Sequence, residues 1–133
     1  MDDIQKSEIV ISKILGLLME WGIQECDLEF DELELDESYR PFFFACISWL
    51  ENEGVIRTDE VVRTLDNVAA GVVIRPVLTS YGMRIMEAEV DLPGVPSQPV
   101  SKAVQEVQSG NAQYAKAGNF TGGLLASFIK SLG

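Results

Sequence analysis

Apolar residues recur at three- and four-residue intervals through the first part of the chain. Between residues 3 and 21 the pattern is carried by Ile4, Ile11, Ile14, Leu15, Leu18 and Trp21. Side chains at this spacing share one face of an α-helix. Gly22 follows at a position where glycine commonly ends a helix. The pattern therefore predicts a first amphipathic helix over residues 3–21.

The next segment, residues 25–35, has a different periodicity. Its apolar side chains first alternate with acids, as in a strand with one buried face: Cys26, Leu28 and Phe30. A short helix would equally suit the spacing of Leu28, Glu32 and Leu35. Strand and helix both stay open for this segment.

A second helix is predicted from about residue 36 to Glu53. Asp36 or Ser38 can cap its start, and Pro41 is tolerated in its first turn. Gly54 supplies the stop. One arc of this helix is apolar and is expected in the core: Phe42, Phe43, Cys46, Ile47, Trp49 and Leu50.

Phe44 falls outside that arc, about 200° around the helix from Phe42. It lies near Ser48 and Glu51. An exposed aromatic side chain beside acids would be a contact anchor for a partner. The alternative is that the N-terminal helix or the C-terminal tail covers Phe44.

Runs rich in β-branched residues follow Gly54. They cover residues 55–57, 61–63 and 72–78, with a break at Asp66-Asn67, and predict a small antiparallel sheet. Thr79 can then cap a last core helix. That helix carries Met83, Ile85 and Met86.

This order of elements resembles a winged helix-turn-helix domain over residues 1–90. Two phrases carry the resemblance, Trp49-Leu50-Glu51-Asn52-Glu53-Gly54-Val55-Ile56 and Leu78-Thr79-Ser80-Tyr81-Gly82. They are similar to the "leucine, then glycine-leucine-isoleucine" and "leucine-threonine-x-x-glycine" phrases of many such regulators. The resemblance implies an α+β fold, mainly α, with a small antiparallel β-hairpin. It concerns the fold and does not define a function.

The last third of the chain is predicted as a linker and a helical appendage. Residues 91–101 hold three of the five prolines and read as a Pro-rich linker. Residues 102–133 form a Gly-interrupted tail whose end has a broad apolar face: Phe120, Leu124, Leu125, Phe128, Ile129 and Leu132. This face can dock back on the domain, form a homodimer or bind another protein. A membrane surface is disfavoured because only Lys130 accompanies it.

Negative charge is concentrated in one short segment. Residues 25–37 hold eight carboxylates in thirteen residues and no Lys or Arg, in a chain of net charge −11. Such a segment is either a solvated face or a docking surface for a basic partner. A calcium loop would need Gly and Glu where Glu32 and Ser38 stand, so no metal is predicted.

Several classes of site lack their residues. The chain has no histidine, which removes His-based catalysis and His metal ligands. Cys26 and Cys46 lie outside any C-x-x-C spacing, and no P-loop, G-x-S-x-G or G-x-G-x-x-G motif occurs. We expect no enzyme activity and no cofactor. Free cysteines, an acidic N-terminus without a signal-like segment and no 20-residue apolar run predict a cytoplasmic protein.

The function predicted from these patterns is that of an acidic interaction protein of the inhibitor, immunity or regulatory-adaptor type. Its partner would be basic and would contact Glu25, Asp27, Glu29, Asp31, Glu32, Glu34, Phe44, Phe120, Leu124, Phe128 and Ile129. The alternative is a dimeric winged-helix regulator that holds DNA phosphates with Arg40, Arg57, Arg63 and Arg75.

Overall fold

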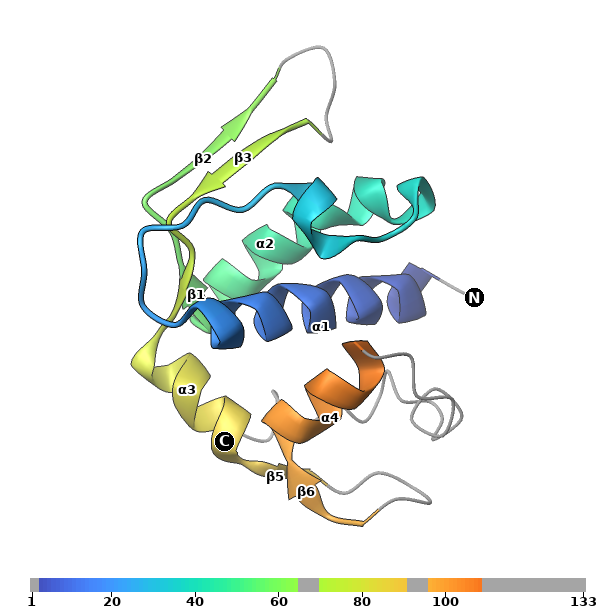
Figure 1. The fold of residues 1–133 in the computed structure, drawn as a ribbon, viewed down its shortest axis with the longest axis vertical. Helices are drawn as coiled ribbons and strands as arrows, with labels where there is room; N and C mark the ends of the chain where they lie inside the picture. The colour runs from blue at the N-terminus through green and yellow to red at the C-terminus, as the bar shows by residue number, and fades with distance from the viewer. Residues whose placement is uncertain (1–2, 65–69, 91–95, 109–133) are drawn as a thin grey trace.

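A computed structural model describes residues 3–64, 70–90 and 96–108 of the chain (Figure 1). The helices are α1 (Asp3–Trp21), the 3-10 helices η1 (Phe30–Leu33) and η2 (Glu37–Phe42), α2 (Phe43–Asn52), α3 (Ser80–Glu87) and α4 (Val100–Gln108). The strands are β1 (Ile56–Arg57), β2 (Glu60–Arg63), β3 (Gly71–Ile74), β4 (Val77–Leu78), β5 (Glu89–Val90) and β6 (Gln98–Pro99). The predicted α+β class, mainly helical with a small antiparallel hairpin, is confirmed.

Helix α1 lies at the centre of the molecule. In Figure 1 it has α2 and the hairpin on one side and α3 and α4 on the other. Its buried apolar side chains are Val10, Ile11, Ile14, Leu15 and Leu18. The predicted bounds are confirmed, and Gly22 ends the helix with φ 69° and an N–H bond to the Leu18 carbonyl. Ile4, counted with the apolar face, is exposed in the first turn.

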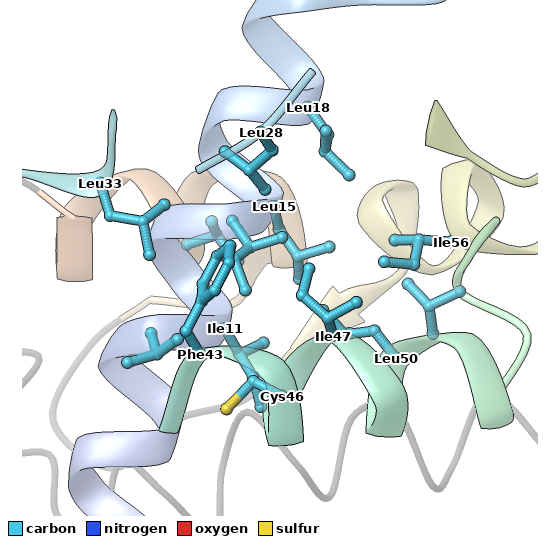
Figure 2. Close-up of a cluster of buried hydrophobic side chains, with 14 of the residues drawn as sticks. Ile11, Leu15, Leu18, Leu28, Leu33, Phe43, Cys46, Ile47, Leu50 and Ile56 are labelled. Atoms are coloured by element: carbon cyan, nitrogen blue, oxygen red, sulfur yellow. The ribbon is translucent and has the colours of Figure 1, made fainter. Parts of the chain in front are cut away.

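The core forms where α1 faces α2. Figure 2 shows Phe43, Ile47 and Leu50 of α2 directed toward Ile11 and Leu15 of α1. Phe43, Leu15 and Leu50 are fully buried. Burial of an apolar side chain of this size contributes about 1.5–3 kcal/mol to folding, so this contact is a major support of the fold.

The predicted second helix is divided in two. Asp36 caps the 3-10 helix η2 by accepting the N–H of Ser38 at 3.0 Å, and the α-helix begins only at Phe43. Pro41 lies inside η2. Because proline has no N–H and its ring crowds the preceding turn, the α-helical bonding starts after it. The expectation of one helix from residue 36 was therefore wrong at its start, whereas Gly54 ends α2 as predicted, with φ 76°.

The hairpin consists of two ladders in one continuous register. Ile56 pairs with Leu78 in the ladder β1–β4, and Glu60 pairs with Ile74 in the ladder β2–β3. Arg75 interrupts the arm between them with a left-handed backbone (φ 48°), and Pro76 follows without a donor N–H. The predicted turn at Asp66-Asn67 lies outside the described residues.

The two phrases that carried the family resemblance contact each other. Thr79 caps α3 by accepting the N–H of Gly82 at 2.9 Å, and its hydroxyl donates to the Gly54 carbonyl at 2.5 Å. A Cβ added at Gly82 would lie 2.1 Å from the Val55 carbonyl oxygen. Glycine at this position therefore allows α3 to approach the start of the hairpin closely.

Residues 96–108 extend the core beyond the predicted domain end at residue 90. β6 pairs with β5, and α4 packs against α1 and α3. Val100, Ala103 and Val104 are buried in the same cluster as the α1 residues. The division into a domain, a linker and a tail stays a prediction, and the described part of the tail begins as an integral helix of the core.

Candidate partner-binding surface

Residues 25–37, here called the acidic connector, link α1 to α2 across one side of the core. Leu28 forms a two-way β-bridge with Val73, in which each N–H donates to the other's carbonyl at 2.8 Å. The 3-10 helix η1 follows at once and buries Phe30 and Leu33. The segment that suited both strand and helix is thus a single bridge followed by a 3-10 turn.

This backbone turns the apolar side chains inward and the acids outward. Leu28, Phe30 and Leu33 are at most 3% exposed, and the Phe30 ring packs edge-on against Phe43 with centroids 5.9 Å apart. The acids predicted as contact residues are all exposed: Glu25, Asp27, Glu29, Asp31, Glu32 and Glu34. The fold therefore presents these six carboxylates on one connected stretch of surface.

Arg40 is the cation that the fold supplies to the connector. Its guanidinium bonds Asp31 at 2.8 Å and Glu37 at 2.7 and 2.9 Å, and lies 4.7 Å from the Phe30 ring centroid. The Arg40 bond lowers the pKa of Glu37, and the two carboxylates raise the pKa of Arg40. Arg40, predicted as a phosphate contact, is engaged by its own chain.

A second arginine meets the connector through its backbone. The N–H of Arg75 donates to the Asp27 carboxylate at 3.1 Å, while its guanidinium bonds Asp59 at 2.5 Å. Arg75 has a left-handed backbone conformation and directs its N–H at Asp27. Its guanidinium contacts the hairpin instead. Asp59 was not among the predicted site residues, because no sequence pattern links it to Arg75.

Four acids of the connector have neither an ion pair nor a side-chain hydrogen bond among the residues that the structure describes. They are Glu25, Glu29, Glu32 and Glu34. Partial burial, with the neighbouring charges of Glu29 and Asp27, raises the pKa of Glu32. With eight acids and two bonds to one arginine, the connector carries an excess of negative charge.

The expected contact anchor Phe44 is buried instead. It is 5% exposed, packs against the Phe43 ring at 5.0 Å, and lies under the guanidinium of Arg63 at 4.7 Å. The prediction of an exposed aromatic was wrong because the helical angle places a side chain relative to its own helix and says nothing of what another element brings over it. The other apolar contact residues, Phe120, Leu124, Phe128 and Ile129, lie outside the described residues.

The arginines of the DNA-binding alternative do not gather at one place. Arg57 and Arg63 stand six residues apart on one arm of the hairpin, about 20 Å of strand. Arg63 lies over Phe44, and Arg75 is paired with Asp59. Arg57 is exposed and makes no ion pair with another described residue.

The described residues hold no group of three or more Cys, Asp or Glu side chains arranged to bind a metal ion. No helix within the described ranges is both long and apolar enough to cross a membrane. Comparison of the chain with protein-family models, curated proteins and solved structures finds no match. Inference about function therefore starts from the geometry and charge of this surface.

Proposed function

We propose that this chain is a non-enzymatic interaction protein, of the inhibitor, immunity or regulatory-adaptor type, that binds a basic protein partner in the cytoplasm. The acidic connector makes the main contact, and the C-terminal segment adds an apolar one through Phe120, Leu124, Phe128 and Ile129. One observation carries the proposal: Glu25, Glu29, Glu32 and Glu34 are exposed together with no ion pair among the described residues.

Electrostatics explains why such a surface suits a basic partner. Like charges that lie close together repel one another; burial is the main cause of the raised pKa of Glu32, and the charges of Glu29 and Asp27 add to it. A cationic surface relieves the repulsion when it docks, and the field of the acids speeds the encounter. The same field repels the phosphates of nucleic acid.

A helix, the Leu28 bridge, the connector, α2 and the hairpin follow one another in an order that is loosely compatible with a winged-helix domain over residues 1–90. In our proposal this domain serves as a protein-binding scaffold. The observation that favours the alternative, DNA binding as a dimer, is the exposed and unpaired Arg57 on the hairpin.

Charge reversal tests the proposal directly. The immobilised full chain is incubated with an extract of its native cells, and bound proteins are eluted with increasing salt and identified. The variant Glu29→Lys/Glu34→Lys is compared with Glu20→Lys/Glu60→Lys, which changes net charge equally at exposed acids outside the connector. We expect a basic protein that the first variant loses and the control retains.

DNA binding is measured on the same variants. If the wild-type chain shifts generic duplex DNA at low salt and Arg57→Glu abolishes the shift, the regulator alternative replaces our proposal. Equal loss of the captured protein in both charge-reversal variants would also refute it, because binding would then follow net charge and not the connector.

A further inference from the structure

An apolar hollow of about 320 Å³ lies between the end of α1 and helix α3, and no residue of the acidic connector lines it. Its lining is mainly Leu18, Met19, Ile23, Leu78, Met83 and Met86. Ile23 is 73% exposed and Met83 38% exposed, and both are among the few large apolar side chains that the described residues leave open to solvent. The hollow is therefore lined mainly by apolar side chains, two of which, Ile23 and Met83, are open to solvent.

The chemistry of the lining suits an apolar segment of protein. Three of the six residues are methionines, whose flexible thioether side chains adapt to irregular partners. Concave, mostly apolar hollows are common binding sites on folded proteins. Glu87 is the one charged residue that lines the hollow.

We propose that the apolar face of residues 120–132 of the same chain docks in this hollow. The place where the described chain ends favours this occupant. Ser101, in the first turn of α4, lines the hollow, and α4 runs only to Gln108 against α1 and α3. Eleven residues then separate Gln108 from Phe120, enough to span up to about 36 Å. The segment is thus tethered within easy reach of its site.

Tethering and charge favour this occupant over a free partner. Eleven intervening residues keep the segment at a high effective concentration near the hollow, so a modest apolar contact suffices for it to dock. Residues 109–133 contain Lys116 and Lys130 and no acid, which matches Glu87 at the rim. The docking concerns the free protein and goes beyond the proposed function, which assigns the same segment a contact in the complex.

Disulfide trapping tests the docking without any partner. In a Cys26→Ser background the pair Met83→Cys/Leu124→Cys is compared with Ile4→Cys/Leu124→Cys, since Ile4 is exposed at the opposite end of α1. The native Cys46 does not compete, because burial raises the pKa of its thiol to about 12. We expect an intramolecular disulfide at Met83 to form at least tenfold faster than at Ile4.

Equal rates for the two pairs would overturn the proposal. So would disulfide-linked dimers as the main product at micromolar protein, because the hollow would then hold the segment of a second copy. Light scattering on a chain that ends at residue 117 adds a check: a monomer before and after truncation agrees with docking within one chain, and a drop in oligomer size contradicts it.

Hydrogen exchange provides a readout that needs no new cysteine. Amides of residues 120–132 should be protected in the wild-type chain and lose at least tenfold protection in Ile23→Lys, while Ile4→Lys retains it. Unprotected amides in the wild-type chain would overturn the docking. None of these measurements involves the basic partner, so their failure leaves the proposed function standing, and the reverse also holds.

Discussion

The acidic connector and the hairpin lie on the same core and are joined by the Leu28–Val73 bridge. They differ in how many of their charged side chains already have a partner. The hairpin arginine Arg75 has a carboxylate partner, and Arg63 lies over an aromatic ring. Within the described part of the connector, two of the eight acids, Asp31 and Glu37, bond a guanidinium, and four others have neither an ion pair nor a side-chain hydrogen bond.

The difference teaches that pairing, and not the number of charges, decides which surface is open to a partner. An arginine that already bonds a carboxylate or covers a ring must give up that contact before it can hold a phosphate. A carboxylate with no bound cation loses only its hydrating water when a partner docks. Among the described residues Arg57 is the one hairpin arginine without such a contact, against four acids of the connector, so the connector is the more available surface.

The largest expected effect comes from removing the anchor of the connector. Phe30→Ala should lower the free energy of unfolding by about 3–5 kcal/mol, because Phe30 is 3% exposed and its loss leaves a cavity beside Phe43. Urea denaturation measures this change. Val62→Ala on the exposed hairpin face is the control, expected within about 0.5 kcal/mol of wild type. A cost below about 1 kcal/mol for Phe30→Ala would show that the connector is held elsewhere.

Replacing Arg40, the cation of the connector, should lower stability and raise affinity for a basic partner. Arg40→Gln loses the bonds to Asp31 and Glu37 and the contact with Phe30, and should lower the free energy of unfolding by about 1 kcal/mol. Affinity for a basic partner should rise at the same time, because two carboxylates are released. Calorimetry and denaturation measure the two effects.

Arg40→Lys is the matched control for that prediction. It keeps the charge but not the two-point bond or the planar contact with the ring. Stability should fall as in Arg40→Gln, while affinity for the basic partner stays near wild type. A parallel rise in affinity for both variants would show that charge at this position is irrelevant to binding.

On the hairpin, the contact of Arg63 with Phe44 has a smaller expected effect. Arg63→Ala should lower the free energy of unfolding by about 0.5–1 kcal/mol, the usual range for an exposed cation over an aromatic ring. Thermal denaturation at matched salt measures it. Unchanged stability together with weakened DNA binding would instead assign Arg63 to phosphate recognition.

The smallest effect is a pH dependence within the connector. The pKa of Glu32 is raised in the folded chain, so the native state holds this proton more tightly than the unfolded state. Its ionisation therefore lowers stability as pH rises from the ordinary glutamate pKa of 4.5 through the higher folded pKa. Because the side chain is mostly exposed, Glu32→Gln should stabilise the protein at pH 7 by only a few tenths of a kcal/mol.

That gain should vanish at low pH, where Glu32 is protonated and resembles glutamine. Denaturation at pH 7 and pH 3.5 compares the two conditions, with Glu60→Gln on the hairpin as the control. A gain that persists unchanged at pH 3.5 would mean that it does not arise from the charge of Glu32.

Local patterns in the sequence were enough to predict most of the helices and the hairpin. Helical spacing located α1, Gly22 and Gly54 marked two ends, and the cap of α3 at Thr79 was read correctly. These features depend on neighbours within about four residues, so a single segment holds the necessary information. The same locality explains why the acids of the connector were correctly expected on the surface.

Tertiary structure alone decided how the charged and aromatic groups are used. The pairing of Arg75 with Asp59, the cover of Arg63 over Phe44 and the hollow beside Ile23 each join elements far apart in the chain. The one signal for the hollow in the sequence was Ile23, an apolar residue directly after Gly22, where α1 ends. The sequence by itself determined which residues are charged and which are apolar. Only the packing determined which of them remain free to meet a partner, because pairing and burial depend on what the folded chain places opposite each side chain.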